Sequence, residues 1–132
     1  MFSSTGKIQL DPLKGTKHFD PWWALLLCDE DIAYYYAWLS KRHGMELEPF
    51  NLWGVHVSVI KGEIPLDQSV WGRYSGMELR INYENDLRFD NGKHAWLDVY
   101  SQDLADFRQS LGYFAKNKYH LTIGRLKIKL TE

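Results

Sequence analysis

Two short segments carry side chains that can move protons and hold an oxyanion. They read VHVSV at residues 55–59 and YHLTI at residues 119–123, so each places a histidine two residues before a hydroxyl among apolar neighbours. Side chains alternate along a strand, so His56 and Ser58 share one face of their strand, and His120 and Thr122 share one face of theirs. If the two strands are neighbours, two imidazoles and two hydroxyls meet on one surface.

That combination suits in-line cleavage of a phosphodiester. One imidazole takes a proton from the nucleophile and the other protonates the leaving oxygen, which histidine can do near neutral pH with its usual pKa of about 6.5. The hydroxyls donate hydrogen bonds to the non-bridging phosphoryl oxygens, where charge is held in the transition state. The layout requires no metal or other cofactor. The sequence leaves open which histidine is the base.

The first motif follows a predicted strand and helix. Residues 22–28 are apolar without alternation, which indicates a strand buried on both faces. Asp29 is a good N-cap, and Gly44 suits the left-handed position after the last turn, so the pattern predicts a helix between them. A second strand is expected over residues 52–60, followed by a long connection over residues 61–76, which contains three glycines and a proline.

The second motif also follows a predicted helix. Residues 77–83 alternate between apolar and polar, as in a half-buried strand, and Asn91-Gly92 favours a hairpin turn. Ser101 is placed to cap a second helix that ends near Gly112. In the last strand, from Tyr119, the apolar positions change parity after Ile123, which predicts a bulge or reversal at Gly124. The fold class expected is therefore α+β, with antiparallel sheets and two main helices.

Composition limits the classes of partner and compartment. The 132 residues carry 16 Lys+Arg and 17 Asp+Glu, for a net charge of −1, which argues against a protein that coats long nucleic acid, including long double-stranded nucleic acid. The lone cysteine, Cys28, excludes an internal disulfide, and no metal-binding spacing is present. No membrane span or secretory signal is visible, so we expect a cytoplasmic single domain over residues 1–132, with residues 1–20 as an irregular N-terminal arm. Its oligomeric state stays open.

The two motifs, HVSV at 56–59 and HLTI at 120–123, resemble the paired His-x-Ser/Thr signatures of the two-histidine (2H) phosphoesterase superfamily. The order of strand, helix and motif is similar over roughly residues 20–125. The resemblance implies a bilobal arrangement of antiparallel sheets with the site between them. It also implies that His56 and His120 are the acid–base pair and that Ser58 and Thr122 bind phosphate. The superfamily includes RNA 2′,3′-cyclic phosphodiesterases, 2′-5′ RNA ligase-like proteins and phage nucleases that destroy cyclic oligonucleotide signals.

Aromatic residues make up 15% of the chain, and two of them are candidates for stacking on a nucleobase. Trp71 and Tyr74 lie in the long connection, where they would either bind substrate or pack down on the sheet. Lys61, Lys118 and Arg125 flank the motifs, where they would attract an anion or simply be solvated.

The sequence therefore predicts a metal-independent phosphodiesterase that acts on a small nucleotide. A cyclic nucleotide or cyclic oligonucleotide is favoured, with viral counter-defence as one biological setting. One alternative is a 2′,3′-cyclic phosphodiesterase that acts on short RNA ends in RNA processing or repair. Another is a binding module that sequesters a nucleotide, or binds a protein partner, without catalysis. In a purely structural alternative, both histidines would belong to the core.

Overall fold

The computed structural model describes residues 1–12, 14–15, 17, 21–49, 53–91 and 94–127. Strands outnumber helices in these ranges. In chain order the elements are β1 (Phe2–Leu10), β2 (Trp23–Cys28), α1 (Glu30–Arg42), β3 (Leu47–Pro49), β4 (His56–Lys61), the 3-10 helix η1 (Gln68–Tyr74), β5 (Glu78–Tyr83), β6 (Arg88–Phe89), β7 (His94–Tyr100), α2 (Gln102–Ser110) and β8 (Tyr119–Leu126). The predicted mixed α+β class is confirmed at this level.

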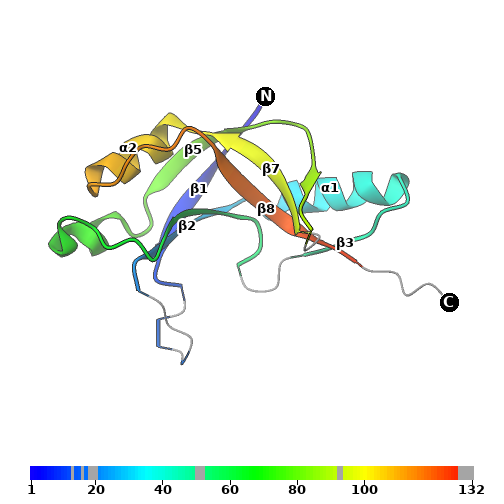
Figure 1. The fold of residues 1–132 in the computed structure, drawn as a ribbon. Helices are drawn as coiled ribbons and strands as arrows, with labels where there is room; N and C mark the ends of the chain where they lie inside the picture. Colours follow the sequence, from blue (N-terminus) through cyan, green and yellow to red (C-terminus); the bar gives the residue numbers. More distant parts are fainter. Residues whose placement is uncertain (13, 16, 18–20, 50–52, 92–93, 128–132) are drawn as a thin grey trace.

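The strands form one antiparallel sheet that closes on itself. Their order is β3-β8-β4-β2-β1-β5-β7-β6, and β7 also pairs with β8, which completes a ring of six strands. Outside the ring, the short strand β3 pairs with β8, and the short strand β6 pairs with β7. Helices α1 and α2 lie on opposite sides of the strands, and β8 runs beside β7 across the middle of the view (Figure 1).

Both helices begin and end at the residues expected from capping chemistry. The Asp29 carboxylate accepts a hydrogen bond from the Asp31 backbone N–H at 2.9 Å, and Gly44 follows α1 with a φ of 78°. The Ser101 hydroxyl accepts from the Leu104 N–H at 3.1 Å at the start of α2. These caps fix where each helix starts after the strand that precedes it.

The core is built from one face of the strands and the apolar stripes of the helices. Val57 on β4, Leu121 on β8 and Leu97 on β7 are fully buried, and each alternates with a polar or aromatic residue on the opposite face. Helix α2 adds Leu104 and other apolar side chains to the same cluster. The motif residues therefore project from the face that is not occupied by this cluster.

The irregular arm predicted for residues 1–20 is wrong over its first half. Residues Phe2–Leu10 form β1, which pairs with β2 on one side and with β5 on the other. The segment contains serines and a glycine, so its composition does not favour a strand, but both rows of its backbone groups find partners in the ring. Gly6 belongs there because a Cβ would lie 2.6 Å from the Leu27 carbonyl oxygen.

Two other boundaries differ from expectation. The strand predicted over 52–60 begins only at His56, because Trp53 and Gly54 form a turn and Gly54 has a φ of 63°; Leu52 lies outside the described residues. The predicted hairpin is present as the antiparallel pairing of Arg88 with Trp96. Gly92 of its Asn-Gly turn lies outside the described residues, so the turn type stays a prediction.

Candidate functional site

The two His-x-hydroxyl strands are direct neighbours. His56 on β4 pairs with Thr122 on β8, and Val57 pairs with Leu121. Cross-strand partners point to the same face, so the motifs share the face opposite the core. A cavity of about 470 Å³ opens there, and its lining includes all four predicted catalytic residues. The residues that line it are Trp23, Trp53, His56, Ser58, Lys61, Asp90, His94, Trp96, His120 and Thr122.

Each motif is followed by a bulge at the same offset. Along β4, Val59 is an extra residue between Ser58, paired with Leu25, and Ile60, paired with Ala24. Along β8, Ile123 is an extra residue between Thr122 and Gly124. The bulge expected at Gly124 is thus present one residue earlier. It explains the change of parity, because an inserted residue exchanges the faces of everything after it.

The two bulges bring a cation onto the face of each motif. Lys61 lines the cavity, with its ammonium 5.2 Å from the centre of the Trp23 ring. Arg125, at the equivalent place after the second motif, lies with its guanidinium 3.4 Å from Nε2 of His94. Buried Arg108 stabilises the β4 bulge, because it donates a 2.8 Å hydrogen bond to the Val59 carbonyl oxygen.

The ring divides into two halves with the same internal pairing. Strands β4, β2 and β1 form one half, strands β8, β7 and β5 form the other, and the halves join at the β4–β8 and β1–β5 pairs. Helix α1 lies between β2 and β4 in the chain, as α2 lies between β7 and β8. The chain order therefore repeats, and each His-x-hydroxyl strand has the same place in its half.

His56 is held in one orientation at the base of the cavity. Only 4% of the residue is exposed, and its Nδ1 lies 2.9 Å from the Gly54 carbonyl oxygen. The Trp53 ring packs edge-on against it, with the two ring centres 5.4 Å apart. A carbonyl oxygen only accepts hydrogen bonds, so Nδ1 carries the proton. In the neutral ring Nε2 is then the unprotonated nitrogen, which can accept a proton.

The turn before His56 is fixed by the first turn of α1. The Glu30 carboxylate accepts a hydrogen bond from the Val55 N–H at 3.1 Å, and a Cβ on Gly54 would lie only 1.9 Å from that same oxygen. Burial lowers the pKa of His56 below its usual value, although the Gly54 hydrogen bond and the Glu30 charge act in the opposite direction. The neutral imidazole is therefore favoured near neutral pH.

His120 has different surroundings. Its side chain is 58% exposed, and its ring stacks on Trp96 with the ring centres 4.7 Å apart and the planes 24° from parallel. Its Nε2 lies 3.9 Å from Oδ1 of Asp98, its cross-strand partner on β7. The second imidazole thus lies between a tryptophan face and a carboxylate, in contact with solvent.

Asp98 is the main polar residue that the sequence analysis missed. The residue is only 2% exposed, and its carboxylate forms ion pairs with Arg88 at 2.9 Å and with Lys118 at 3.3 Å. Burial would raise the pKa of this carboxyl, but the Lys118 and Trp96 hydrogen bonds and the two positive charges outweigh it and hold the pKa below its usual range. Strand alternation puts Trp96 and Asp98 on one face, but only the β7–β8 register brings them to His120.

Tryptophans form the apolar walls of the cavity, but Trp71, the tryptophan predicted to stack on a ligand, is not among them. Trp23 and Trp53 contact each other edge-to-face with their ring centres 5.0 Å apart, and Trp96 lies beside His120. Trp53 could have been suspected from its place three residues before His56. Trp23 could not, because it reaches the site only through its pairing with Lys61.

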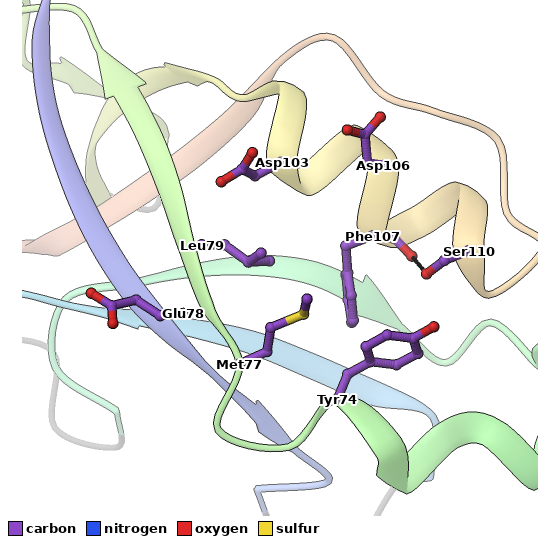
Figure 2. A pocket seen from close by; sticks show the side chains of 8 residues that line it. All are labelled: Tyr74, Met77, Glu78, Leu79, Asp103, Asp106, Phe107 and Ser110. Atoms are coloured by element: carbon purple, nitrogen blue, oxygen red, sulfur yellow. Dashed lines mark hydrogen bonds between the residues drawn. The ribbon is translucent and has the colours of Figure 1, made fainter.

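The structure does not place Trp71 or Tyr74 in this cavity, which corrects their predicted role as stacking residues there. Trp71 is buried, donates a 2.9 Å hydrogen bond from its indole N–H to Asp11 and packs edge-on against Trp22. Tyr74 packs against Phe107 of α2 and lines a separate pocket beside that helix (Figure 2). Both side chains pack down on the fold, in agreement with the alternative role given for them above.

The described part of the chain contains no metal-binding cluster and no membrane-spanning helix. Within it, no group of three or more histidine, cysteine, aspartate or glutamate side chains is arranged to hold a metal ion. No helix there has the length and apolar character needed to cross a bilayer. Comparison of the chain with protein-family models, curated proteins and solved structures found no match.

Proposed function

We propose that this chain is a phosphodiesterase that cleaves a small nucleotide by general acid–base catalysis, with a cyclic nucleotide or cyclic oligonucleotide as the favoured substrate. The observation that supports this most is the pairing of two His-x-hydroxyl strands in one cavity, with His56 directly opposite Thr122. Residues far apart in the chain thus supply two imidazoles and two hydroxyls to one face.

In this proposal His56 is the base. Its Nδ1 proton is engaged by the Gly54 carbonyl, so Nε2 accepts the proton of the attacking hydroxyl or water. As the new phosphorus–oxygen bond forms, the bond to the leaving oxygen breaks. His120 then donates its proton to that oxygen, so the two rings end the step in exchanged protonation states and solvent restores them.

The hydroxyls and the nearby ammonium hold the charge that develops on the phosphoryl group. Ser58 and Thr122 are donors two residues after each histidine, and Lys61 lines the same cavity. The two proton transfers need only the imidazoles, so the proposed mechanism requires no metal.

The cavity favours a compact ligand. A volume of about 470 Å³ lies within the range of about 300–1,000 Å³ that is usual for small-molecule sites. The net charge of −1 offers little to a long polyanion. Tryptophan walls at Trp23 and Trp53 suit a nucleobase, which stacks on aromatic faces.

The repeated chain order supports, as part of the proposal, the bilobal arrangement of the 2H phosphoesterase superfamily. Each lobe would consist of three strands and a helix, with one motif at the edge where the halves meet. A cytoplasmic location also belongs to the proposal. The biological setting, viral counter-defence among others, depends on which nucleotide is cleaved.

The test is hydrolysis by the purified chain in EDTA. The panel consists of cyclic mono-, di- and trinucleotides with 3′-5′ and 2′-5′ linkages, and a short RNA that ends in a 2′,3′-cyclic phosphate. The proposal expects cleavage of at least one cyclic nucleotide. Cleavage of the RNA end alone would favour the RNA-processing alternative, and binding of intact ligand without any product would favour the binding module.

A further inference from the structure

We infer that Asp98 is a positioning residue that, with Trp96, holds His120 as an oriented cation, so that His120 and not His56 serves as the acid. The inference rests on the proposed function and deepens it by explaining how two equivalent histidines acquire opposite roles. It is drawn from the places where the two halves of the ring differ.

The halves can be compared position by position through their strand pairing. His56 pairs across to Leu27 on β2, whereas His120 pairs across to Asp98 on β7. Two residues further along each motif strand, Ser58 pairs with Leu25 and Thr122 pairs with Trp96. The two residues beside the first motif are therefore leucines, and their equivalents beside the second are a tryptophan and a carboxylate.

Trp96 and Asp98 act on His120 as one unit. The Trp96 indole N–H donates a 3.2 Å hydrogen bond to Oδ1 of Asp98, and the same oxygen lies 3.9 Å from Nε2 of His120. The indole is thereby fixed in the plane on which the imidazole stacks. A tryptophan face attracts a cation, and a nearby carboxylate favours the imidazolium, so both neighbours stabilise the protonated ring.

The charges around this unit make the carboxylate necessary. Its other oxygen, Oδ2, faces two cations, Arg88 at 2.9 Å and Lys118 at 3.3 Å. Without the charge of Asp98, these cations would repel a protonated His120. The charged and titratable side chains around His120 are Asp98 on β7, Arg88 on β6, Lys118 just before β8, His56 and Lys61 on β4, and Asp90 and His94 where β6 meets β7.

The decisive experiment removes the negative charge of Asp98 in one variant and the positive charge of Lys118 in another. In Asp98→Asn we expect the alkaline limb of the rate profile, and the midpoint of the His120 imidazole signal followed by NMR, to move to lower pH than in wild type. In Lys118→Gln, Asp98 keeps its charge but no longer has the Lys118 ammonium beside it. The alkaline limb and the His120 midpoint should then move to higher pH. The matched control is Asp86→Asn, because Asp86 pairs with Arg88 at 3.3 Å but is 64% exposed. The Asp86→Asn variant should leave the alkaline limb and the His120 midpoint close to their wild-type positions.

Shifts in opposite directions would support the inference, because a purely structural role would not reverse sign with the charge that is removed. Equal shifts in one direction, or none, would overturn it. Should Asp98→Asn fail to fold, Lys118→Gln decides alone, since that side chain is 52% exposed. The NMR titration needs no substrate. Titration shifts as expected without hydrolysis would therefore overturn only the proposed function, whereas hydrolysis with unmoved titrations would overturn only this inference.

Discussion

His56 and Thr122 lie directly opposite each other on neighbouring antiparallel strands, so their side chains project side by side from the same face. Continuation of the same register would bring Ser58 beside His120. Each end of the proposed reaction would then have an imidazole from one half of the ring and a hydroxyl from the other. Each motif would depend on its counterpart, and a change in one hydroxyl would affect the chemistry at the histidine across from it.

Removal of the Thr122 hydroxyl should slow the chemical step. We expect Thr122→Val to lower kcat by about 10²-fold, because a donor to the developing phosphoryl charge is lost while the size of the side chain is kept. Thr122→Ser restores the hydroxyl and should regain most of the rate. Thr5→Val, on an exposed position of β1, is the control and should leave kcat unchanged. Equal rates for Thr122→Val and wild type would contradict the proposed contact.

The acidic side of the rate profile should reflect the surroundings of His56. The base must be neutral, and burial lowers its pKa, so it stays neutral to a lower pH than an exposed histidine would. We therefore expect kcat/KM to hold its value as the pH falls through about 6.5, the ordinary value for histidine, and to decline only below it. An acidic limb centred above pH 6.5 would be incompatible with His56 as the base.

Gly54 should prove essential to the placement of His56. Gly54→Ala forces a side chain into a φ of 63° and against the Glu30 carboxylate, which would displace both the Gly54 carbonyl and the Val55 N–H. We expect kcat to fall at least tenfold. Gly44→Ala, after α1, has a φ of 78° with open space around it, so it should cost about 1–2 kcal/mol of stability and leave kcat unchanged. Equal effects of the two variants on kcat would argue against this role.

The tryptophans of the cavity and of the core should respond differently. Trp53→Leu removes an aromatic wall beside His56 and should raise KM by on the order of tenfold, as loss of one base–aromatic stack would. Trp71→Leu should leave KM unchanged and lower the free energy of unfolding by about 2–4 kcal/mol, because Trp71 is a buried core residue bound to Asp11. The reverse pattern would restore Trp71 as a ligand-binding residue.

The sequence was informative wherever a local rule determines structure. The caps at Asp29 and Ser101 and the change of parity near Gly124 each depend on neighbouring residues, and all three are present in the structure. Strand β1 escaped prediction because its composition is polar and its stability comes from strands on both sides.

In the candidate site, too, the features set by a local rule could be predicted, and those set by pairing between strands could not. Alternation alone predicts that His120 and Thr122 share a face, and the structure brings them to one cavity with the first motif. Asp98 reaches His120, and Trp23 reaches Lys61, only through the register between strands, which no local pattern contains. The polar, glycine-rich segment around Trp71 favours an exposed stacking residue, but the indole donates a hydrogen bond to Asp11, which lies far away in the sequence.

The proposed reaction depends most directly on the two imidazoles. The measurement is the turnover of the best-cleaved nucleotide of the panel in EDTA, by wild type, His56→Ala, His120→Ala and the double variant. Each variant should first be shown by circular dichroism to be folded. We predict that each single substitution lowers kcat by about 10²–10⁴-fold and that the double variant is little worse than either, because the two rings act in one step. Wild-type turnover by the folded double variant would contradict the account.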